Sequence, residues 1–414
     1  MRIALDIRAV QSRRYGERGV ARYTRGLVGG LLAIDAPIGA LLLDPTRPSP
    51  DDVPDPWARS GLLTTATSAD IRALPRPFAV HWSSPFEMDR PVSTAMSGLA
   101  IDLADRSIAT VYDLIPATMP EIYLQDHAVR RAYETRLRLL RDADLLLAIS
   151  DDCRNDVIEV LGVDAERVVT VYAATNQAPS PEDPGDDRAV LGAELPAVTR
   201  TPVLSVSGYE PRKNTLALID AFAELDPDLR RDLQLVLVCS IPAHGRAEWL
   251  ERAQQRGLGS DEVVVTGSVS DRALAALHRA AVLEVFPSLA EGFGLPVLEA
   301  AHARTPVITS STTATPEILD LPASTFDPRD VDEMAARIDE ALHDDTLRAA
   351  LVSAGDAAVR RYTWEEVARR TVDAYEGLTP LSRRRPAPRT RVALVGPWPP
   401  AVSGVASYDE RLAA

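Results

Sequence analysis

Short apolar runs alternate with amphipathic helical stretches from the first residues of this chain onward. Such runs, bounded by polar or turn residues, are typical of buried strands, and the stretches between them have the helical period of about 3.6 residues. In the first half of the chain, strand-like runs occupy residues 3–7, 40–43, 79–82, 108–112, 145–149 and 168–172, and helical patterns occupy residues 20–32 and 128–141. This alternation predicts a doubly wound α/β fold.

A second series of the same kind follows a segment that has no steady period. Residues 178–202 concentrate Pro, Asp, Glu and Gly, which indicates an interdomain connection. The strand-like runs of the second series occupy residues 203–206, 235–239, 263–266, 283–286 and 307–309. We therefore expect two Rossmann-like domains, residues 1–177 and 203–362, and then a helix at 363–378 that packs across the domain boundary.

The end of the chain repeats its beginning. RVAL at residues 391–394 echoes RIAL at 2–5, and GVASY further on echoes GVARY at 19–23. We expect residues 391–414 to begin a second, truncated copy of the unit, after an exposed linker at 379–390. The alternative is a terminal strand and helix that merely look similar.

Charge limits what the protein can bind through broad electrostatics. Asp and Glu number 60 against 45 Lys and Arg, which gives a formal net charge of -15. Nucleic acid and anionic membranes would both repel such a surface. An anionic ligand therefore needs a locally basic pocket, and we expect no nucleic-acid partner.

Cysteine usage and hydropathy favour the cytoplasm. Cys153 and Cys239 lie far apart, so they predict no multi-thiolate metal site and fit a reducing compartment. The first residues contain Asp6 and Arg8 where a signal peptide would be apolar, and no run reaches the length of a membrane span. Peripheral contact with the inner face of the cytoplasmic membrane is the closest membrane association we expect.

The segment from residue 283 to residue 317 predicts a strand, a glycine-rich loop and a helix in that order. Pro296 stands in the first turn of the helix, where the missing N–H costs nothing. Gly292 and Gly294 let the loop backbone approach a ligand, and the helix N-terminus favours a phosphate. Glu291 and Glu299, with seven residues between them, can serve different parts of that ligand and lack the spacing of metal ligands.

A basic turn contains the only lysine of the chain. The segment at residues 208–214, GYEPRKN, follows a predicted strand and precedes a helix. Arg212 and Lys213 can neutralise a diphosphate leaving group there, because ligands bind at the carboxyl ends of strands in doubly wound sheets. The alternative is a polar turn with a solvated basic pair.

The two segments together resemble retaining glycosyltransferases of the GT-B fold, specifically family 4. The resemblance rests on E-x7-E with its interior GFGLP and on EPRKN, which is similar to the turn of mannosyltransferases that build polysaccharides and O-antigens. It implies two Rossmann-like domains facing across a cleft, the first for the acceptor and the second for a nucleotide-sugar donor. It also implies that Glu291 contacts the donor sugar, that Gly292, Phe293, Gly294 and Leu295 meet sugar and phosphate, and that Glu299 holds the ribose.

The same resemblance adds residues at the edges of the site. Ser268 and Val269 would lie beside the nucleotide base, although helix capping at Ser270 explains this turn without a function. Gly19, in GVARYT, resembles a glycine of the family loop near the donor phosphates, although a simple turn is the alternative.

Acceptor-side residues come from the first domain. Asp113 matches a family position that is commonly preceded by histidine, whereas Tyr112 precedes it here. We count Asp113 with Glu291, Arg212 and Lys213 as catalytic candidates. His81 is expected to line the acceptor side, with a hydrogen-bonded core histidine as the alternative.

The resemblance implies transfer of mannose from GDP-mannose to a hydroxyl of a growing polysaccharide or lipid-linked glycan, with UDP- and ADP-sugars left open. We expect a front-face mechanism that retains the anomeric configuration, with no cofactor and no metal. The D-x-D patterns at residues 142–144 and 330–332 fit helix boundaries instead of a metal site. The alternative function is a catalytically weak nucleotide-sugar-binding or scaffolding half of a larger bifunctional glycosyltransferase, whose second unit would be its partner.

Overall fold

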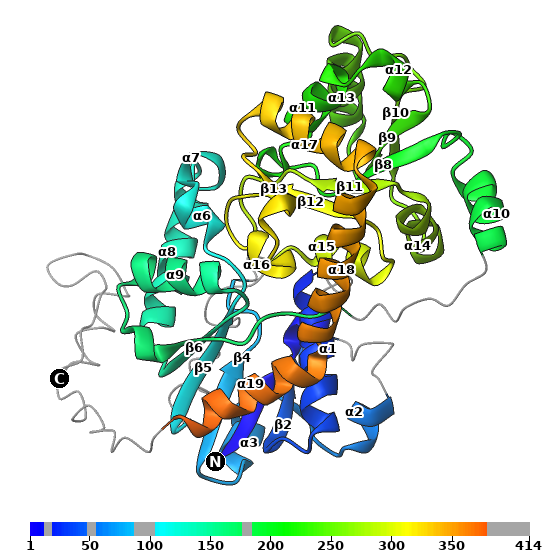
Figure 1. Ribbon diagram of the computed structural model, residues 1–414. Helices are drawn as coiled ribbons and strands as arrows, with labels where there is room; N and C mark the ends of the chain where they lie inside the picture. The colour runs from blue at the N-terminus through cyan, green and yellow to red at the C-terminus, as the bar shows by residue number, and fades with distance from the viewer. Residues whose placement is uncertain (12–18, 48–54, 87–103, 176–183, 379–414) are drawn as a thin grey trace, which may run out of the picture. The chain divides into compact units, whose positions relative to one another are not determined.

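The computed structural model describes residues 1–11, 19–47, 55–86, 104–175 and 184–378 (Figure 1). The linker and the second unit expected at residues 379–390 and 391–414 lie outside these ranges. Residues Met1–Tyr375 form one compact unit, which contains two separate sheets. In the described ranges, every helix is too short or too polar to cross a membrane.

The first sheet has seven parallel strands in the order β3-β2-β1-β4-β5-β6-β7. Its strands are β1 (Arg2–Asp6), β2 (Ile38–Leu43), β3 (Leu63–Thr65), β4 (Phe78–Trp82), β5 (Arg106–Val111), β6 (Leu145–Ala148) and β7 (Val168–Thr170). The helical elements that accompany them are η1 (Arg8–Gln11), α1 (Gly19–Ala33), α2 (Asp55–Arg59), α3 (Ser68–Ala73), α6 (Ile115–Thr118), α7 (Pro120–Tyr123), α8 (His127–Arg141), α9 (Asp151–Leu161) and η2 (Ala165–Arg167).

The second sheet has six parallel strands in the order β10-β9-β8-β11-β12-β13. Its strands are β8 (Thr201–Val206), β9 (Leu233–Val238), β10 (Val263–Gly267), β11 (Leu283–Phe286), β12 (Val307–Ser310) and β13 (Thr325–Phe326). The remaining helical elements are α10 (Pro184–Glu194), η3 (Pro211–Lys213), α11 (Thr215–Glu224), α12 (Pro227–Arg230), α13 (Ala243–Gln255), α14 (Asp271–Ala280), α15 (Leu295–His302), α16 (Pro316–Leu319), η4 (Pro322–Ser324), α17 (Val331–His343), α18 (Asp345–Arg361) and α19 (Trp364–Glu376).

Helices cover both faces of the second sheet, which explains why its strands are almost continuously apolar. Leu235 and Leu237 of β9 pack on one face with Phe222 of α11. Val236, between them in the sequence, packs on the other face with Leu277 of α14. The α/β class with two Rossmann-like sheets is therefore confirmed.

One helix differs from the expectation for residues 178–202. Helix α10 forms inside this segment, and its Val190 and Leu191 are buried in the same cluster as Val236. Pro and Asp suggested a connection, but both residue types are also common in the first turn of a helix. Residues 184–194 thus belong to the second domain, and β8 begins at Thr201 instead of residue 203.

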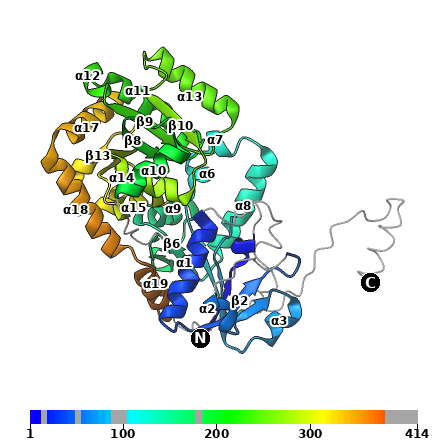
Figure 2. The same ribbon diagram turned by 90° about the vertical axis from the view of Figure 1, so that its right-hand side faces the viewer.

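Helix α19 leaves the second domain and packs on the first, beside α1 (Figure 2). The indole of Trp364 meets the ring of Tyr23 at 5.3 Å between centroids, and the backbone of α1 approaches Trp364 closely at Gly26. Farther along α19, the hydroxyl of Tyr375 bonds to Nδ1 of His81 at 2.7 Å. The end of the chain described here is therefore fixed to the first domain by buried contacts.

We predict that Gly26→Ala destabilises the protein. A Cβ at this position would lie 1.9 Å from Cε2 of Trp364, so α19 would have to move away from α1. Overpacking of this kind costs about 1–3 kcal/mol, which should lower the Tm in a thermal melt by several degrees. The matched control is Gly29→Ala in the same helix, where nothing lies within 4 Å of the new Cβ. A Gly26→Ala Tm equal to that of Gly29→Ala would contradict this account of the packing.

Candidate active site

The order of the second sheet places the candidate site at its switch point. Strand β8 has β9 on one side and β11 on the other, so the chain leaves the carboxyl ends of β8 and β11 in opposite winding directions. Crevices that bind ligands form at such points in parallel sheets. The loop after β8 contains Arg212 and Lys213, and the loop after β11 contains Glu291, so the topology brings both predicted segments together.

A buried carboxylate lies between the two cations. Nζ of Lys213 donates to Oε1 of Glu291 at 2.6 Å, and Nη1 of Arg212 donates to Oε2 at 2.8 Å. Burial alone would raise the pKa of Glu291, but Lys213 and then Arg212 hold it below its usual value. The side chain of Lys213 is only 11% exposed, which excludes the alternative of a solvated basic pair.

Further hydrogen bonds lock the two loops to each other. The backbone N–H of Leu289 donates to the carbonyl of Arg212 at 2.7 Å, and Nη1 of Arg212 donates to the carbonyl of Ala290 at 2.8 Å. Asn214 adopts the left-handed region with φ of 57°, and its amide donates to the carbonyls of Pro287 and Pro328. The ammonium of Lys213 also lies 5.4 Å from the ring centre of Phe286. The cations are therefore held in place before any ligand binds.

The loop leads directly into a helix whose first turn has no side-chain cap. Gly294 precedes α15 with φ of 112°, a conformation that favours glycine, and Pro296 stands in the first turn. The N-cap Gly294 offers no side-chain cap, Pro296 has no N–H, and the N–H of Val297 donates to the carbonyl of Gly294 at 3.0 Å. The start of α15 can therefore serve an anion through the N–H of Leu295 and the helix dipole. Phe293 is buried, with its ring centre 5.2 Å from that of Tyr362, so its side chain anchors the glycine-rich loop to the protein core.

Glu299 lies on α15 and faces a cation from the first domain. Its Oε1 is 3.9 Å from Nη1 of Arg22 in α1, the helix that begins at Gly19. Burial raises the pKa of Glu299, and the nearby His278 and Arg22 oppose this shift. In the motif GVARYT, only Gly19 was predicted from the sequence to lie at the site. Arg22, three residues later in the same motif, was not.

The first domain meets the glycine-rich loop at the end of β5. A Cβ on Gly292 would lie 2.0 Å from the carbonyl oxygen of Tyr112 and 3.1 Å from Cβ of Asp113, so only glycine fits this contact. Burial raises the pKa of Asp113, while Arg212 from the second domain lowers it. The hydroxyl of Tyr112 donates to the carbonyl of Ser83 at 2.6 Å. The structure therefore brings Asp113 and Tyr112 to the same site as Glu291.

Two other predicted positions lie apart from this cluster. Ser268 is exposed after β10, and Val269 packs partly into the core under α14. Ser270 accepts a hydrogen bond from the N–H of Ala273, so the capping interpretation holds for that residue. Strand β10 is two strands away from β8 in the sheet, so Ser268 and Val269 can reach only a distant part of a ligand centred on Glu291.

The acceptor-side role expected for His81 is corrected by its position. His81 is fully buried in β4, where Nδ1 bonds to the hydroxyl of Tyr375 and Nε2 bonds to Oγ1 of Thr110 at 2.8 Å. Burial lowers its pKa to about 3, so the ring stays neutral. His81 is thus the hydrogen-bonded core histidine that the sequence left as the alternative.

The D-x-D segments lie at helix boundaries, as expected. Asp142 is the C-cap of α8, and Asp330 is the N-cap of α17 with its carboxylate accepting from the N–H of Glu333. In the described part of the chain, no group of three or more His, Cys, Asp or Glu side chains gathers as a metal site requires.

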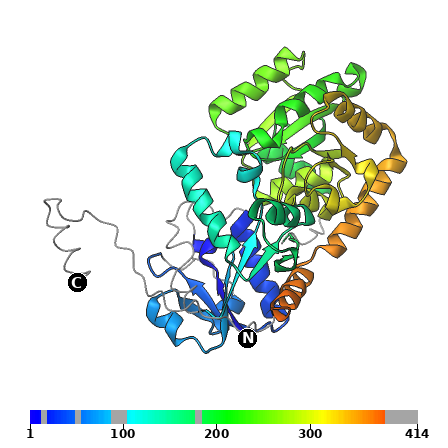
Figure 3. The same ribbon diagram turned by 90° about the vertical axis from the view of Figure 1, so that its left-hand side faces the viewer.

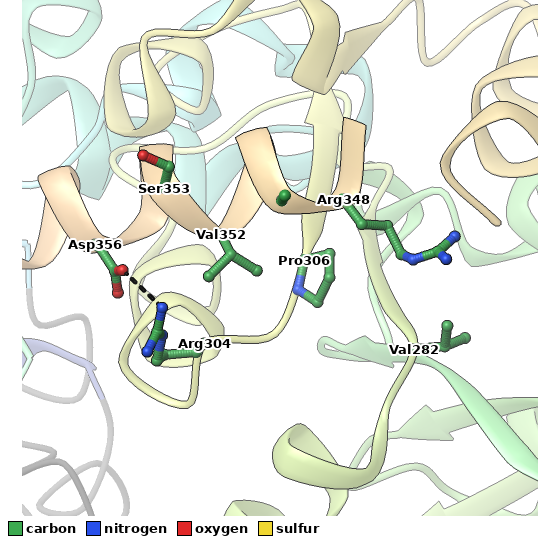
Figure 4. A pocket seen from close by; sticks show the side chains of 8 residues that line it. Val282, Arg304, Pro306, Arg348, Val352, Ser353 and Asp356 are labelled. Atoms are coloured by element: carbon green, nitrogen blue, oxygen red, sulfur yellow. Dashed lines mark ion pairs between the residues drawn. The ribbon is translucent and has the colours of Figure 1, made fainter. Parts of the chain in front are cut away.

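A separate surface pocket does not coincide with this site (Figure 4). It has a volume of about 530 Å³ and lies against α18. Its two arginines already have protein partners, because Arg304 pairs with Asp356 at 3.2 Å and Arg348 donates to the carbonyls of Ala341 and Leu342. The lining residues are Val282, Arg304, Pro306, Arg348, Ala349, Val352, Ser353 and Asp356.

Comparison with known proteins identifies the family. Residues 193–357 match the family model described as glycosyl transferases group 1. The chain is 31% identical over 276 residues to the O-antigen chain mannosyltransferase B of Escherichia coli, with 66% of this chain and 70% of that protein covered. It is 29% identical over 300 residues to a serotype-specific mannosyltransferase WbdA of the same species, with 70% of this chain covered. The chain spans only 36% of that longer relative.

Solved structures share the two-domain arrangement. Sucrose-phosphate synthase from Thermosynechococcus elongatus superposes with a TM-score of 0.65 at 21% identity, covering 91% of this chain and 99% of the other. Anabaena HepE in complex with UDP also gives a TM-score of 0.65, at 18% identity, covering 91% of this chain and all (100%) of the other. With its relatives and its two Rossmann-like domains, the chain belongs to the group 1 glycosyltransferases of the GT-B fold.

Proposed function

We propose that this glycosyltransferase moves mannose from GDP-mannose to a hydroxyl of a growing polysaccharide or lipid-linked glycan, with retention at the anomeric carbon. The observation that carries the proposal is the pairing of Lys213 and Arg212 with buried Glu291 beside the uncapped start of α15. Two fixed cations and a helix N-terminus suit a diphosphate. The names of the two relatives support mannose as the transferred sugar, since both are mannosyltransferases.

The chemistry requires charge stabilisation on the leaving diphosphate. As the bond between the anomeric carbon and the phosphate oxygen breaks, the acceptor oxygen bonds to the same face of the sugar. The acceptor proton passes to the departing phosphate oxygen. Arg212, Lys213 and the N-terminus of α15 then stabilise the charge on the diphosphate, in place of a metal ion.

Glu291 and Asp113 have different parts in this proposal. Glu291 balances the two cations, and on donor binding its carboxylate accepts hydrogen bonds from sugar hydroxyls as the cations turn to the diphosphate. Asp113 contributes from the acceptor side, where the first domain touches the glycine-rich loop at Gly292. The reacting groups are therefore complete only when both domains are in contact.

The repeat of the opening sequence supports one more proposal. Because RVAL and GVASY at residues 391–408 follow the order of RIAL and GVARY at residues 2–23, we propose that a second glycosyltransferase unit starts here. Expression of a longer chain that includes the proposed second unit, with Lys213→Ala in the first, would test for a separate transferase activity.

A panel of nucleotides and nucleotide sugars should identify the donor by thermal shift. At a concentration about 100-fold above its Kd, a ligand that binds only the folded state stabilises it by about 2.7 kcal/mol, which raises the Tm by several degrees. We expect GDP and GDP-mannose to raise the Tm more than UDP, ADP and their sugars do. A larger Tm shift with a UDP-sugar would identify that sugar as the donor in place of GDP-mannose. No shift with any member of the panel would contradict the proposed function.

Arg212→Ala and Lys213→Ala should each lower the turnover of GDP-mannose at least about 100-fold, because one preorganised charge contact contributes about 3 kcal/mol to transition-state stabilisation. Turnover is measured as GDP release with EDTA present, which also tests independence from metals. Arg252→Ala is the control, since Arg252 pairs with Asp220 outside the site. Donor binding without any turnover by the unmodified chain would favour the scaffolding alternative.

Gly292→Ala should lower transfer far more than it lowers GDP binding. The added Cβ would collide with the carbonyl of Tyr112, so the two domains could no longer meet at the glycine-rich loop. Isothermal titration with GDP and a transfer assay separate the two effects. The control is Gly192→Ala in α10, where the new Cβ meets nothing within 4 Å. Normal transfer by Gly292→Ala would show that this contact is not needed.

A further inference from the structure

Arg212 is held by more than its ion pair with Glu291. Its Nε donates to Oε2 of Glu210 at 2.9 Å, while Nη1 is engaged by Glu291 and by the carbonyl of Ala290. The hydroxyl of Tyr123 also interacts with the guanidinium of Arg212. The guanidinium plane is therefore fixed by two carboxylates on different edges.

Glu210 is shared between the two domains. The same oxygen that accepts from Arg212 also accepts from the hydroxyl of Tyr123 at 3.1 Å. Tyr123 ends α7, in the segment that follows β5 of the first sheet and extends toward the second domain (Figure 3, cyan). One carboxylate oxygen thus links a first-domain phenol to a second-domain guanidinium.

Glu210 contributes to the orientation of the Arg212 side chain more than to the stability of the fold. Its side chain is 45% exposed, and ion pairs that water can reach contribute little to stability. A long arginine side chain, however, loses much rotamer freedom when it is fixed in one orientation, and a second carboxylate supplies that constraint. Glu210 follows Gly208 and Tyr209 in the turn after β8, so it moves with the second domain, whereas Tyr123 moves with the first.

We propose that Tyr123 and Glu210 are positioning residues that couple contact between the domains to the orientation of Arg212, an inference that rests on the proposed function. When the domains meet, the phenol of Tyr123 holds the Glu210 carboxylate against Nε of Arg212. The guanidinium is then oriented for the diphosphate as the sugar bond breaks. When the domains separate, Glu210 loses this partner and Arg212 loses part of its support.

The protonation state of the phenol agrees with this role. Burial and the adjacent Glu210 carboxylate raise the pKa of Tyr123 to about 12. The hydroxyl therefore remains a donor throughout the pH range of an enzyme assay. The coupling should then leave the shape of the pH profile unchanged.

Steady-state kinetics of the full chain with GDP-mannose test the proposal. Tyr123→Phe removes only the hydroxyl, and we expect kcat to fall about tenfold, as for loss of a hydrogen bond to a charged group, with KM for the donor nearly unchanged. The unchanged KM is expected because the donor binds the second domain before the domains meet. Glu210→Ala should lower kcat at least as far, and Glu210→Gln should recover part of the loss because its amide oxygen can still accept one hydrogen bond.

A double mutant gives the sharper result. If Tyr123 acts through Glu210, then Tyr123→Phe should have almost no further effect in the Glu210→Ala background. Tyr172→Phe is the matched control, because its hydroxyl also donates to a carboxylate, that of Asp151 at 3.0 Å, but within the first domain. We expect its kcat to equal that of the unmodified chain.

Several outcomes would overturn the coupling. Multiplicative effects of the two substitutions, an increase in KM with kcat unchanged, or unaltered kinetics in Tyr123→Phe would each do so while the unmodified chain remains active. If the unmodified chain turns over no nucleotide sugar, the proposed function itself fails, and the coupling fails with it. Thermal melts of each variant exclude unfolding as the cause of a lower kcat.

Discussion

A single buried carboxylate organises the loops of the second domain. Glu291 is 9% exposed, and a charge taken out of water at this depth is costly unless cations and hydrogen bonds compensate it. Lys213 and Arg212 supply both, and because they belong to the loop after β8, the pairing ties that loop to the one after β11. The start of α15 is fixed as a consequence, since Gly294 follows Glu291 by only three residues.

The same charges bear on how an acidic protein would hold the diphosphate of the proposed donor. Around the two cations lie three carboxyl groups, those of Glu291, Glu210 and Asp113, so the cluster as a whole is not strongly positive. Burial raises the pKa of Asp113, which makes its neutral form more accessible. In the proposed function, exchange of carboxylate partners for phosphate oxygens would keep the local charge nearly balanced, with binding energy from preorganised donors more than from net charge.

The sequence predicts those parts of the fold and site that depend on local patterns. The strand and helix periods, the glycines before α15 and the proline in its first turn act within a few residues, so they indicated the two sheets and the loop that leads into α15. Arg212 and Glu291 could be chosen separately, but their contact joins residues 79 positions apart and follows only from strand order. Tyr123 and Glu210, 87 positions apart on different domains, carry no local signal at all. His81 was misplaced because periodicity cannot distinguish a polar core residue from one that faces a ligand.

The contacts between the two domains differ in kind along their boundary. At α19, the indole of Trp364 and the phenol of Tyr375 are inserted into the first domain, and such packing is lost only at the cost of exposing apolar surface. Other contacts between the domains are polar: Glu317 accepts from the first N–H groups of α9 at 2.7 and 2.9 Å, and Tyr123 donates to Glu210. Polar contacts can be exchanged for water at little net cost. The coupling proposed through Glu210 uses this difference: the polar contacts near the glycine-rich loop are the ones that break when the domains separate, while α19 keeps them joined.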